Sequence, residues 1–91
     1  IAAAIGIQQL KKLPRFLKRR EYLAKRYLGS LANLPLILPA DDIDGGSHSW
    51  HLFVIRLQDN VKMNRDELVQ FLNDKGIGPS VHYVPLHRQP Y

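Results

Sequence analysis

The chain has 91 residues and a mass of 10.5 kDa, with 45% hydrophobic and 23% charged residues and a net charge of +5. A chain of this size makes one small domain at most, and it buries only about 60–65% of the surface that its unfolded form exposes. The hydrophobic fraction is too high for a disordered protein. The sequence contains no cysteine, which excludes disulfides, a thiolate nucleophile and any metal site built on cysteine.

The basic residues are concentrated in one segment. Residues 11–26 hold eight Lys or Arg side chains and one acid, whereas residues 34–91 hold five basic and seven acidic residues. We interpret the basic segment as the solvated face of an amphipathic helix, because its charges lie opposite apolar positions at helical spacing. The alternative is a stand-alone nucleic-acid-binding module that contacts phosphates with the helix between Lys11 and Arg26.

No segment of the sequence has the length and apolarity of a membrane span, which needs about 18–20 uninterrupted apolar residues. The apolar N-terminus has no basic flank and no cleavage site, so it is not a signal peptide. We therefore expect a cytoplasmic protein with neither a nucleic-acid nor a membrane partner. Both ends also resemble interrupted elements, because Ile1 is followed at once by apparent helix interior and residues 87–91 end in a loop. We expect a piece of a longer protein.

Residues 1–33 are predicted to be a linking helix. Apolar side chains recur at spacings of three and four, which is typical of one buried stripe. Pro14 removes a backbone hydrogen bond and clashes with the preceding turn, so we predict a kink or a restart that gives helices over 2–13 and 14–32. The stripe comprises Ile5, Leu10, Leu13, Phe16, Leu17, Leu23, Tyr27, Leu28 and Leu31.

The remainder, residues 34–91, is predicted to be a small α+β domain that is incomplete at its C-terminal end. Residues 36–38 lie between prolines and are predicted to form an edge strand. Residues 49–57 are apolar on both faces, which predicts a central strand covered on both sides. A third strand is predicted over 79–84. The expected order is α-α-β-β-α-β, with helices packed on a small, mainly antiparallel sheet.

One helix of this domain has clear boundaries in the sequence. Asn64 and Glu67 have the spacing of a capping box, and Asp66 adds a second acid at the positive end of the helix dipole. Gly76 follows the last apolar position, where helices commonly end in the left-handed conformation. The buried stripe of this helix is predicted to contain Leu68, Phe71 and Leu72.

The last sixteen residues concentrate polar side chains in a segment braced by prolines. His82, Tyr83, His87 and Arg88 follow one another closely in this segment. Rigid loops with convergent donors are typical of binding sites. Imidazole and phenol groups can hydrogen-bond hydroxyls, and a guanidinium group can pair with phosphate. The segment therefore suits a polyhydroxylated, phosphorylated ligand, although a purely structural role stays open.

The four histidines do not predict a metal site. His48 and His51 are three residues apart, and in a strand residues at this spacing point to opposite faces. His82 and His87 flank Pro85 in a turn, and no carboxylate ligand lies near them in the sequence. We interpret His51, like Trp50, as a structural residue of the strand.

Three segments together resemble the DegT/DnrJ/StrS family of sugar aminotransferases: AAIGIQQLKKL at 3–13, WHLFVIRL at 50–57 and GIGPSVHYVPLHRQPY at 76–91. The resemblance implies a homodimeric, fold-type-I enzyme that depends on pyridoxal 5'-phosphate (PLP). It implies transfer of an amino group, usually from glutamate, to a keto group on a nucleotide-linked sugar. It also implies that this chain is the end of the linking helix and most of the small C-terminal domain.

The resemblance further implies where the site residues lie. His82, Tyr83 and His87 match the family's loop at the mouth of the active site, near the nucleotide sugar. The lysine that binds PLP and the other cofactor contacts would lie outside this sequence, so we expect the chain alone to be inactive. Pro79 stands where many members have a small or hydroxylated residue, which puts a substrate contact there in doubt. A degenerate remnant with a structural or dimerising role is a third interpretation.

Overall fold

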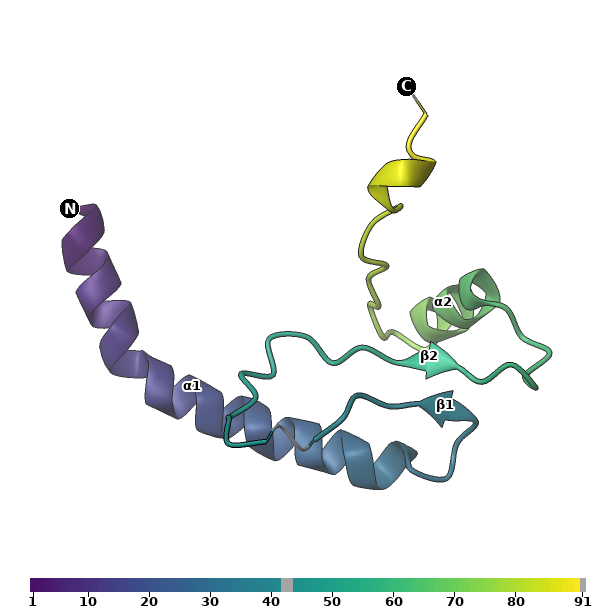
Figure 1. The fold of residues 1–91 in the computed structure, drawn as a ribbon, viewed down its shortest axis with the longest axis horizontal. Helices are drawn as coiled ribbons and strands as arrows, with labels where there is room; N and C mark the ends of the chain where they lie inside the picture. The colour runs from purple at the N-terminus through teal and green to yellow at the C-terminus, as the bar shows by residue number, and fades with distance from the viewer. Residues whose placement is uncertain (42–43, 91) are drawn as a thin grey trace. The chain divides into compact units, whose positions relative to one another are not determined.

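The structure is a computed structural model that describes residues 1–41 and 44–90. The chain forms two compact units, Ile1–Asn60 (unit 1) and Val61–Tyr91 (unit 2). Unit 1 contains α1 (Ala2–Leu31), β1 (Leu36–Ile37) and β2 (Arg56–Leu57), and unit 2 contains α2 (Arg65–Asp74) and the 3-10 helix η1 (Leu86–Arg88) (Figure 1). The small α+β class with an antiparallel sheet is as predicted, whereas the domain boundary predicted after residue 33 stays a prediction.

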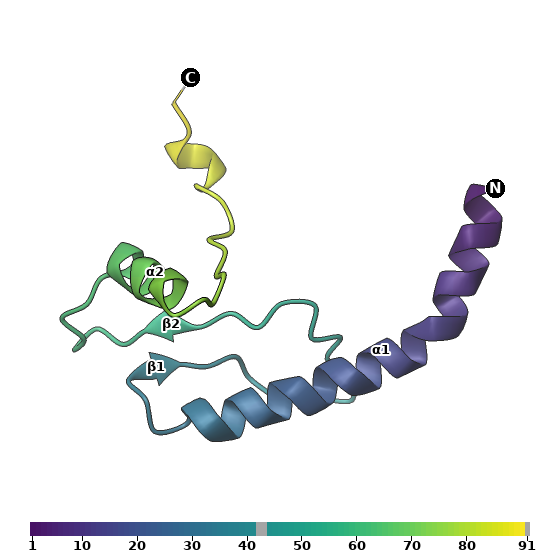
Figure 2. The ribbon, with the colours of Figure 1, turned by 180° about the vertical axis from the view of Figure 1, so that it is seen from behind.

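α1 is one helix of 30 residues that contains Pro14. Of the kink or restart predicted at Pro14, the restart into two helices is therefore wrong. A proline removes one intrahelical hydrogen bond and bends a helix, but strong helix formers on both sides can carry the helix through it. Figures 1 and 2 show the axis of α1 changing direction in its N-terminal half.

Only the C-terminal half of α1 buries an apolar stripe. Ala24 is 3% exposed, and Leu17, Leu28 and Leu31 on the same face are half-buried. β1 and β2 lie beside this half of the helix in both ribbon views (Figures 1 and 2). The remaining predicted stripe positions are exposed among the described residues, namely Ile5, Leu10, Leu13, Phe16, Leu23 and Tyr27.

β1 and β2 form a two-stranded antiparallel sheet. Leu36 is paired with Leu57, and Ile37 with Arg56. The Gln58 N–H donates to the carbonyl of Pro35 at 3.1 Å, which extends the pairing by one bond. The strand predicted over 36–38 is thus present and ends one residue early.

The prediction of a central strand over 49–57 is wrong for most of its length. The backbone of Trp50 has a positive φ of 48°, which interrupts an extended chain. Phe53 and Ile55 are half-buried, but Leu52 and Val54, which alternate with them, are exposed, so this segment has one covered face instead of two. A strand needs a neighbour to satisfy its backbone groups, and within the described residues β1 offers only two residues for pairing.

α2 has the predicted capping box. The Asn64 side-chain oxygen accepts hydrogen bonds from the N–H groups of Asp66 at 2.9 Å and Glu67 at 3.0 Å. In return, the Glu67 carboxylate accepts from the Asn64 N–H at 2.8 Å. At the other end, Gly76 has a φ of 76°, and the Ile77 N–H donates to the Leu72 carbonyl at 2.9 Å. These are the local bonds that end a helix at a left-handed glycine.

The prediction of a third strand over 79–84 is wrong. No strand occurs in the described part of unit 2, so this segment has no partner there. Tyr83 has a φ of 57°, and its N–H donates to the Val81 carbonyl at 3.1 Å. A hydrogen bond between residues two apart closes a tight turn, and such a turn is incompatible with an extended strand. The following loop contains η1, which the sequence analysis did not predict.

Candidate functional site

The candidate site is the loop of residues 82–89 in unit 2, called the HY loop below. Pro85 precedes η1 with a φ of −54° and a ψ of 145°. The Arg88 N–H donates to the Pro85 carbonyl at 2.8 Å, and the Gln89 N–H donates to the Leu86 carbonyl at 3.2 Å. These bonds form one tight turn, in which His87 and Arg88 are successive residues.

The other two predicted site residues form an aromatic pair. The ring centroids of His82 and Tyr83 are 5.2 Å apart, and their planes are inclined by 34°. Tyr83 is 82% exposed although its backbone is in the left-handed region. Such a conformation costs a bulky residue about 1–3 kcal/mol, and it is commonly kept where a side chain must point in a particular direction.

The structure therefore arranges the four predicted residues as two pairs. His82 and Tyr83 contact each other, and His87 and Arg88 share η1. Within the described residues, no hydrogen bond or ring contact joins one pair to the other. All four side chains are exposed, so they can offer hydrogen-bond donors and one fixed positive charge to a ligand.

Sequence reasoning missed one residue of this loop. The Gln89 side-chain nitrogen donates to the Val84 carbonyl at 3.0 Å and thereby closes the loop around η1. The signal available in the sequence was its position directly before Pro90, which restricts Gln89 to an extended backbone. The structure gives it a φ of −71° and a ψ of 133°.

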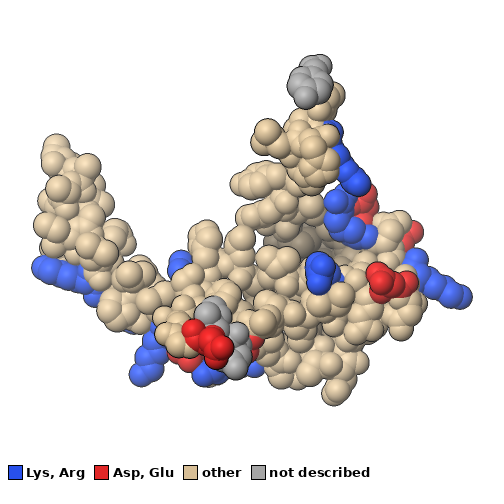
Figure 3. Space-filling model, viewed as in Figure 1, with Lys and Arg blue, Asp and Glu red and all other residues tan. Residues whose placement is uncertain are grey.

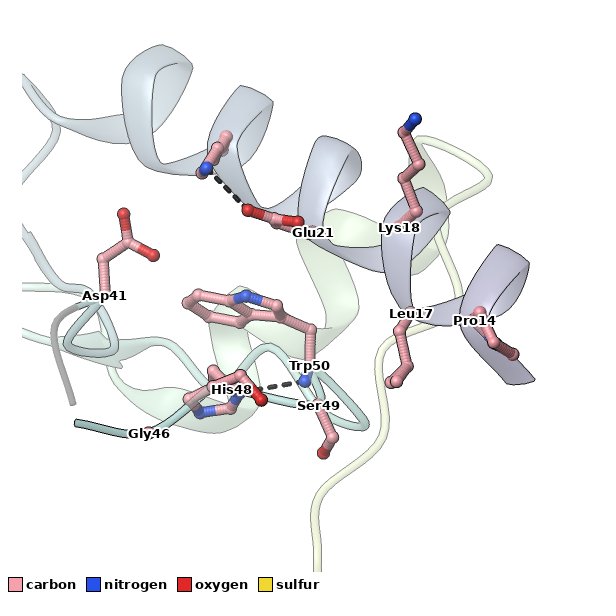
Figure 4. Close-up of a pocket in the computed structure, with 11 residues that line it drawn as sticks. Pro14, Leu17, Lys18, Glu21, Asp41, Gly46, His48, Ser49 and Trp50 are labelled. Carbon is pink, nitrogen blue, oxygen red and sulfur yellow. Dashed lines mark hydrogen bonds and ion pairs between the residues drawn. The ribbon is translucent and has the colours of Figure 1, made fainter. Parts of the chain in front are cut away.

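Unit 1 holds a separate open cavity of about 820 Å³ between α1 and the loop before β2 (Figure 4). Trp50 forms one wall of it and is only 6% exposed. His48 stacks on the indole with ring centroids 4.1 Å apart, and Phe53 follows at 5.9 Å. The lining residues are Pro14, Leu17, Lys18, Glu21, Lys25, Asp41, Gly46, Ser47, His48, Ser49 and Trp50.

One ion pair dominates the charges of this cavity. Lys25 Nζ lies 2.7 Å from Glu21 Oε1. The hydrogen bond from Lys25 lowers the pKa of Glu21, and the same bond raises the pKa of Lys25. Both groups therefore stay ionised at neutral pH. Across the described ranges, no group of three His, Cys, Asp or Glu side chains lies close enough to hold a metal ion.

The cavity does not fit PLP on its own. A lysine that binds a carbonyl cofactor must supply a neutral amine. Lys25 is held as a cation by Glu21, and the only other lysine on the cavity wall, as far as the chain is described, is Lys18. As observed here, Lys25 therefore does not present the neutral amine that the cofactor needs.

The basic segment lies on the surface of α1, from which Lys and Arg side chains project in Figure 3. The guanidinium groups of Arg19 and Arg26 lie 5.2 Å and 5.9 Å from the centre of the Tyr22 ring. This geometry favours a cation–π contact with the ring. Nucleic-acid binding by this face stays an untested alternative. Among the helices of the described residues, none is both long and apolar enough to cross a membrane.

Comparison with known sequences identifies the class. The family model described as the DegT/DnrJ/EryC1/StrS aminotransferase family matches residues 1–91. The matched range includes α1, the sheet, α2 and the HY loop. The chain belongs to this family, as the three sequence segments predict.

Two curated relatives show the same extent of similarity. The spore coat polysaccharide biosynthesis protein SpsC of Bacillus subtilis is 38% identical over 93 residues, and the uncharacterized protein MJ1066 of Methanocaldococcus jannaschii is 39% identical over 92 residues. Each alignment covers 100% of this chain and 24% of the relative. The chain thus spans about a quarter of the length of these curated relatives. No solved structure matches it.

Proposed function

We propose that this chain is the C-terminal part of a PLP-dependent sugar aminotransferase, and that its HY loop binds a nucleotide-linked sugar. The observation that carries the proposal is the family match over residues 1–91. The name of SpsC, a polysaccharide biosynthesis protein, supports a sugar substrate. The proposed amino donor is glutamate, and the proposed enzyme is a cytoplasmic homodimer.

The chemistry of the HY loop supports this substrate class. The imidazole of His82 and the phenol of Tyr83 can each donate or accept a hydrogen bond, as sugar hydroxyls require. The Arg88 guanidinium carries a permanent charge and can pair with the diphosphate of a nucleotide sugar. His87 lies beside Arg88 on η1 and offers a further ring nitrogen.

These residues would bind and orient the sugar rather than break bonds. PLP, when bound, supplies the electron sink that amino transfer needs. Because the chain spans about a quarter of the length of its curated relatives, we propose that the cofactor and its lysine lie in the part of the enzyme outside this chain. The contribution of the HY loop is then orientation, which can account for several kcal/mol of a reaction barrier.

The test is steady-state kinetics of the intact enzyme with a nucleotide keto-sugar. We expect His82→Ala and Tyr83→Phe to raise KM for the sugar about three- to tenfold, the value of one lost hydrogen bond. Arg88→Ala should raise it about tenfold or more, because a charged partner of the diphosphate is lost. His51→Ala is the matched control, since His51 is exposed in unit 1 and lies outside the HY loop.

The outcome separates the proposal from a purely structural role of the chain. If all three variants keep the KM of the wild type while folding normally, the HY loop does not bind the sugar. An equal rise of KM in His51→Ala would also contradict the proposal, because the effect would then not belong to the loop.

A further inference from the structure

We infer that Gln89 is a positioning residue, which fixes η1 so that His87 and Arg88 meet the sugar nucleotide together. This inference rests on the proposed function of the HY loop and adds a residue that does not itself contact the substrate. Its starting point is the hydrogen bond of 3.0 Å from Gln89 Nε2 to the carbonyl oxygen of Val84.

This bond joins the residues on either side of η1 and so closes the loop around it. Its two ends lie five residues apart, and η1 with His87 and Arg88 lies between them. Over residues 77–90 of the described chain, it is the one hydrogen bond made by a side chain. The two backbone bonds of η1 shape the turn and reach back no further than Pro85, and a tie to Val84 needs a further bond. Gln89 provides that tie.

The Val84 carbonyl is also the link to the first pair of site residues. Val84 follows Tyr83, whose left-handed backbone directs the chain into the loop. A bond that holds Val84 therefore restrains both the direction of Tyr83 and the position of η1. The side chains of the loop are exposed, and the contact between the rings of His82 and Tyr83 does not reach η1, so the hydrogen bond of Gln89 has a large share in the order of the turn.

The chemistry of the amide group makes the role specific. A carbonyl oxygen only accepts hydrogen bonds, so the nitrogen end of the Gln89 side chain must face Val84. A carboxylate of the same shape has no donor and would place negative charge against the carbonyl. Pro90 assists, because the residue before a proline is restricted to extended backbone, and this restriction keeps the Gln89 side chain at the end of the turn.

The experiment measures equilibrium binding of UDP-glucose and dTDP-glucose to the intact enzyme by calorimetry, using the tighter of the two as the probe. Gln89→Met keeps the length of the side chain but lacks the donor, and Gln89→Glu keeps the shape and replaces the donor by a charge. We expect both to weaken binding about three- to tenfold. In turnover, we expect the loss to fall on KM for the sugar rather than on kcat.

Gln70→Met is the matched control. The Gln70 side chain also donates one exposed hydrogen bond, to the carboxylate of Asp74 at 2.8 Å, but it lies on α2 outside the HY loop. We expect its binding of the probe to equal that of the wild type. Thermal unfolding of each variant shows whether a loss of binding reflects global unfolding instead of local misplacement.

A double-mutant cycle tests whether Gln89 acts through η1. If it does, Gln89→Met should have less than half of its effect on binding in a His87→Ala, Arg88→Ala background, because the groups that it positions are gone. Full additivity overturns the inference, since Gln89 would then act independently of η1. Unchanged binding in both Gln89 variants overturns it as well.

The failure of this inference differs from the failure of the proposed function. If His82→Ala and Arg88→Ala weaken binding but the Gln89 variants do not, only the positioning role falls. If the wild-type enzyme binds neither nucleotide sugar, or if the His82 and Arg88 variants bind normally, the proposed function falls and the positioning role falls with it.

Discussion

Trp50 adopts a backbone conformation that residues with a side chain rarely take, and His48 stabilises it. The Trp50 N–H donates to the Nδ1 atom of His48 at 2.9 Å, and the two rings stack. This bond requires the neutral imidazole, because a protonated Nδ1 is a donor and cannot accept. His48 thus stabilises the backbone turn at Trp50 and also covers the side chain of this residue, the only tryptophan of the sequence.

We predict that His48→Ala lowers the free energy that keeps the Trp50 side chain buried by about 1–2 kcal/mol, because the hydrogen bond and the stacked ring are lost. His48→Asn should retain more of it, since an asparagine oxygen commonly accepts from the backbone N–H two residues on. The measurement is the emission maximum of Trp50 in the 91-residue chain, which should shift to longer wavelength in His48→Ala. A shift of equal size in His51→Ala would contradict the prediction.

Elements that depend on local bonds could be predicted from the sequence, and elements that depend on distant partners could not. The ends of α2 follow from Asn64, Glu67 and Gly76, all of which act within a few residues. The strands predicted over 49–57 and 79–84 needed neighbours, and β1 pairs with only two residues of the first. At Pro14 the local rule predicted a kink or a restart, and the restart does not occur, because α1 continues through the proline as one helix.

The same division applies to the candidate site. The residue types of the HY loop identified His82, Tyr83, His87 and Arg88 as binding groups. Their arrangement in two pairs depends on a positive φ at Tyr83 and on the 3-10 turn, which the alternation of side chains did not indicate. Gln89 was missed because its role comes from a bond across the loop; the following Pro90 indicates an extended backbone at Gln89, but not the partner of its side chain.

For α2, we predict that Asn64→Ala costs about 1 kcal/mol of helix stability, the usual value of an N-cap. The amides of Asp66 and Glu67 lose their acceptor, so their hydrogen exchange should become faster. Asn73→Ala is the matched control: it makes the same substitution near the other end of α2, where alanine favours a helix. Unchanged exchange at Asp66 and Glu67 in Asn64→Ala would show that the cap observed here does not stabilise the helix.

For the molecule as a whole, burial is low. Among the described residues, only the apolar side chains of Ala24 and Trp50 are buried, while Ile5, Ile7 and Leu10 on α1 are more than half exposed. A small chain has little core to stabilise it. The alignments with SpsC and MJ1066 cover 24% of those proteins, so relatives carry much additional polypeptide against which such a surface can pack. This supports the proposal that the site is completed by residues outside this chain.

If the cofactor is bound by residues outside this chain, the chain alone should not form a specific bond to PLP. The 91-residue chain alone, incubated with one equivalent of PLP and treated with borohydride, should show no stoichiometric label at any single lysine by mass spectrometry. Lys25 lies in the cavity of unit 1, but it is paired with Glu21, and its raised pKa favours the protonated amine, which is not a nucleophile. Glu21→Gln removes that carboxylate and should give only scattered labelling, because a free amine without a cofactor site has no preference over other exposed lysines.

The intact enzyme should be labelled once, at a lysine outside this sequence. A single labelled lysine within residues 1–91 would place the cofactor in this chain and remove the basis for treating the HY loop as a part that only orients the sugar.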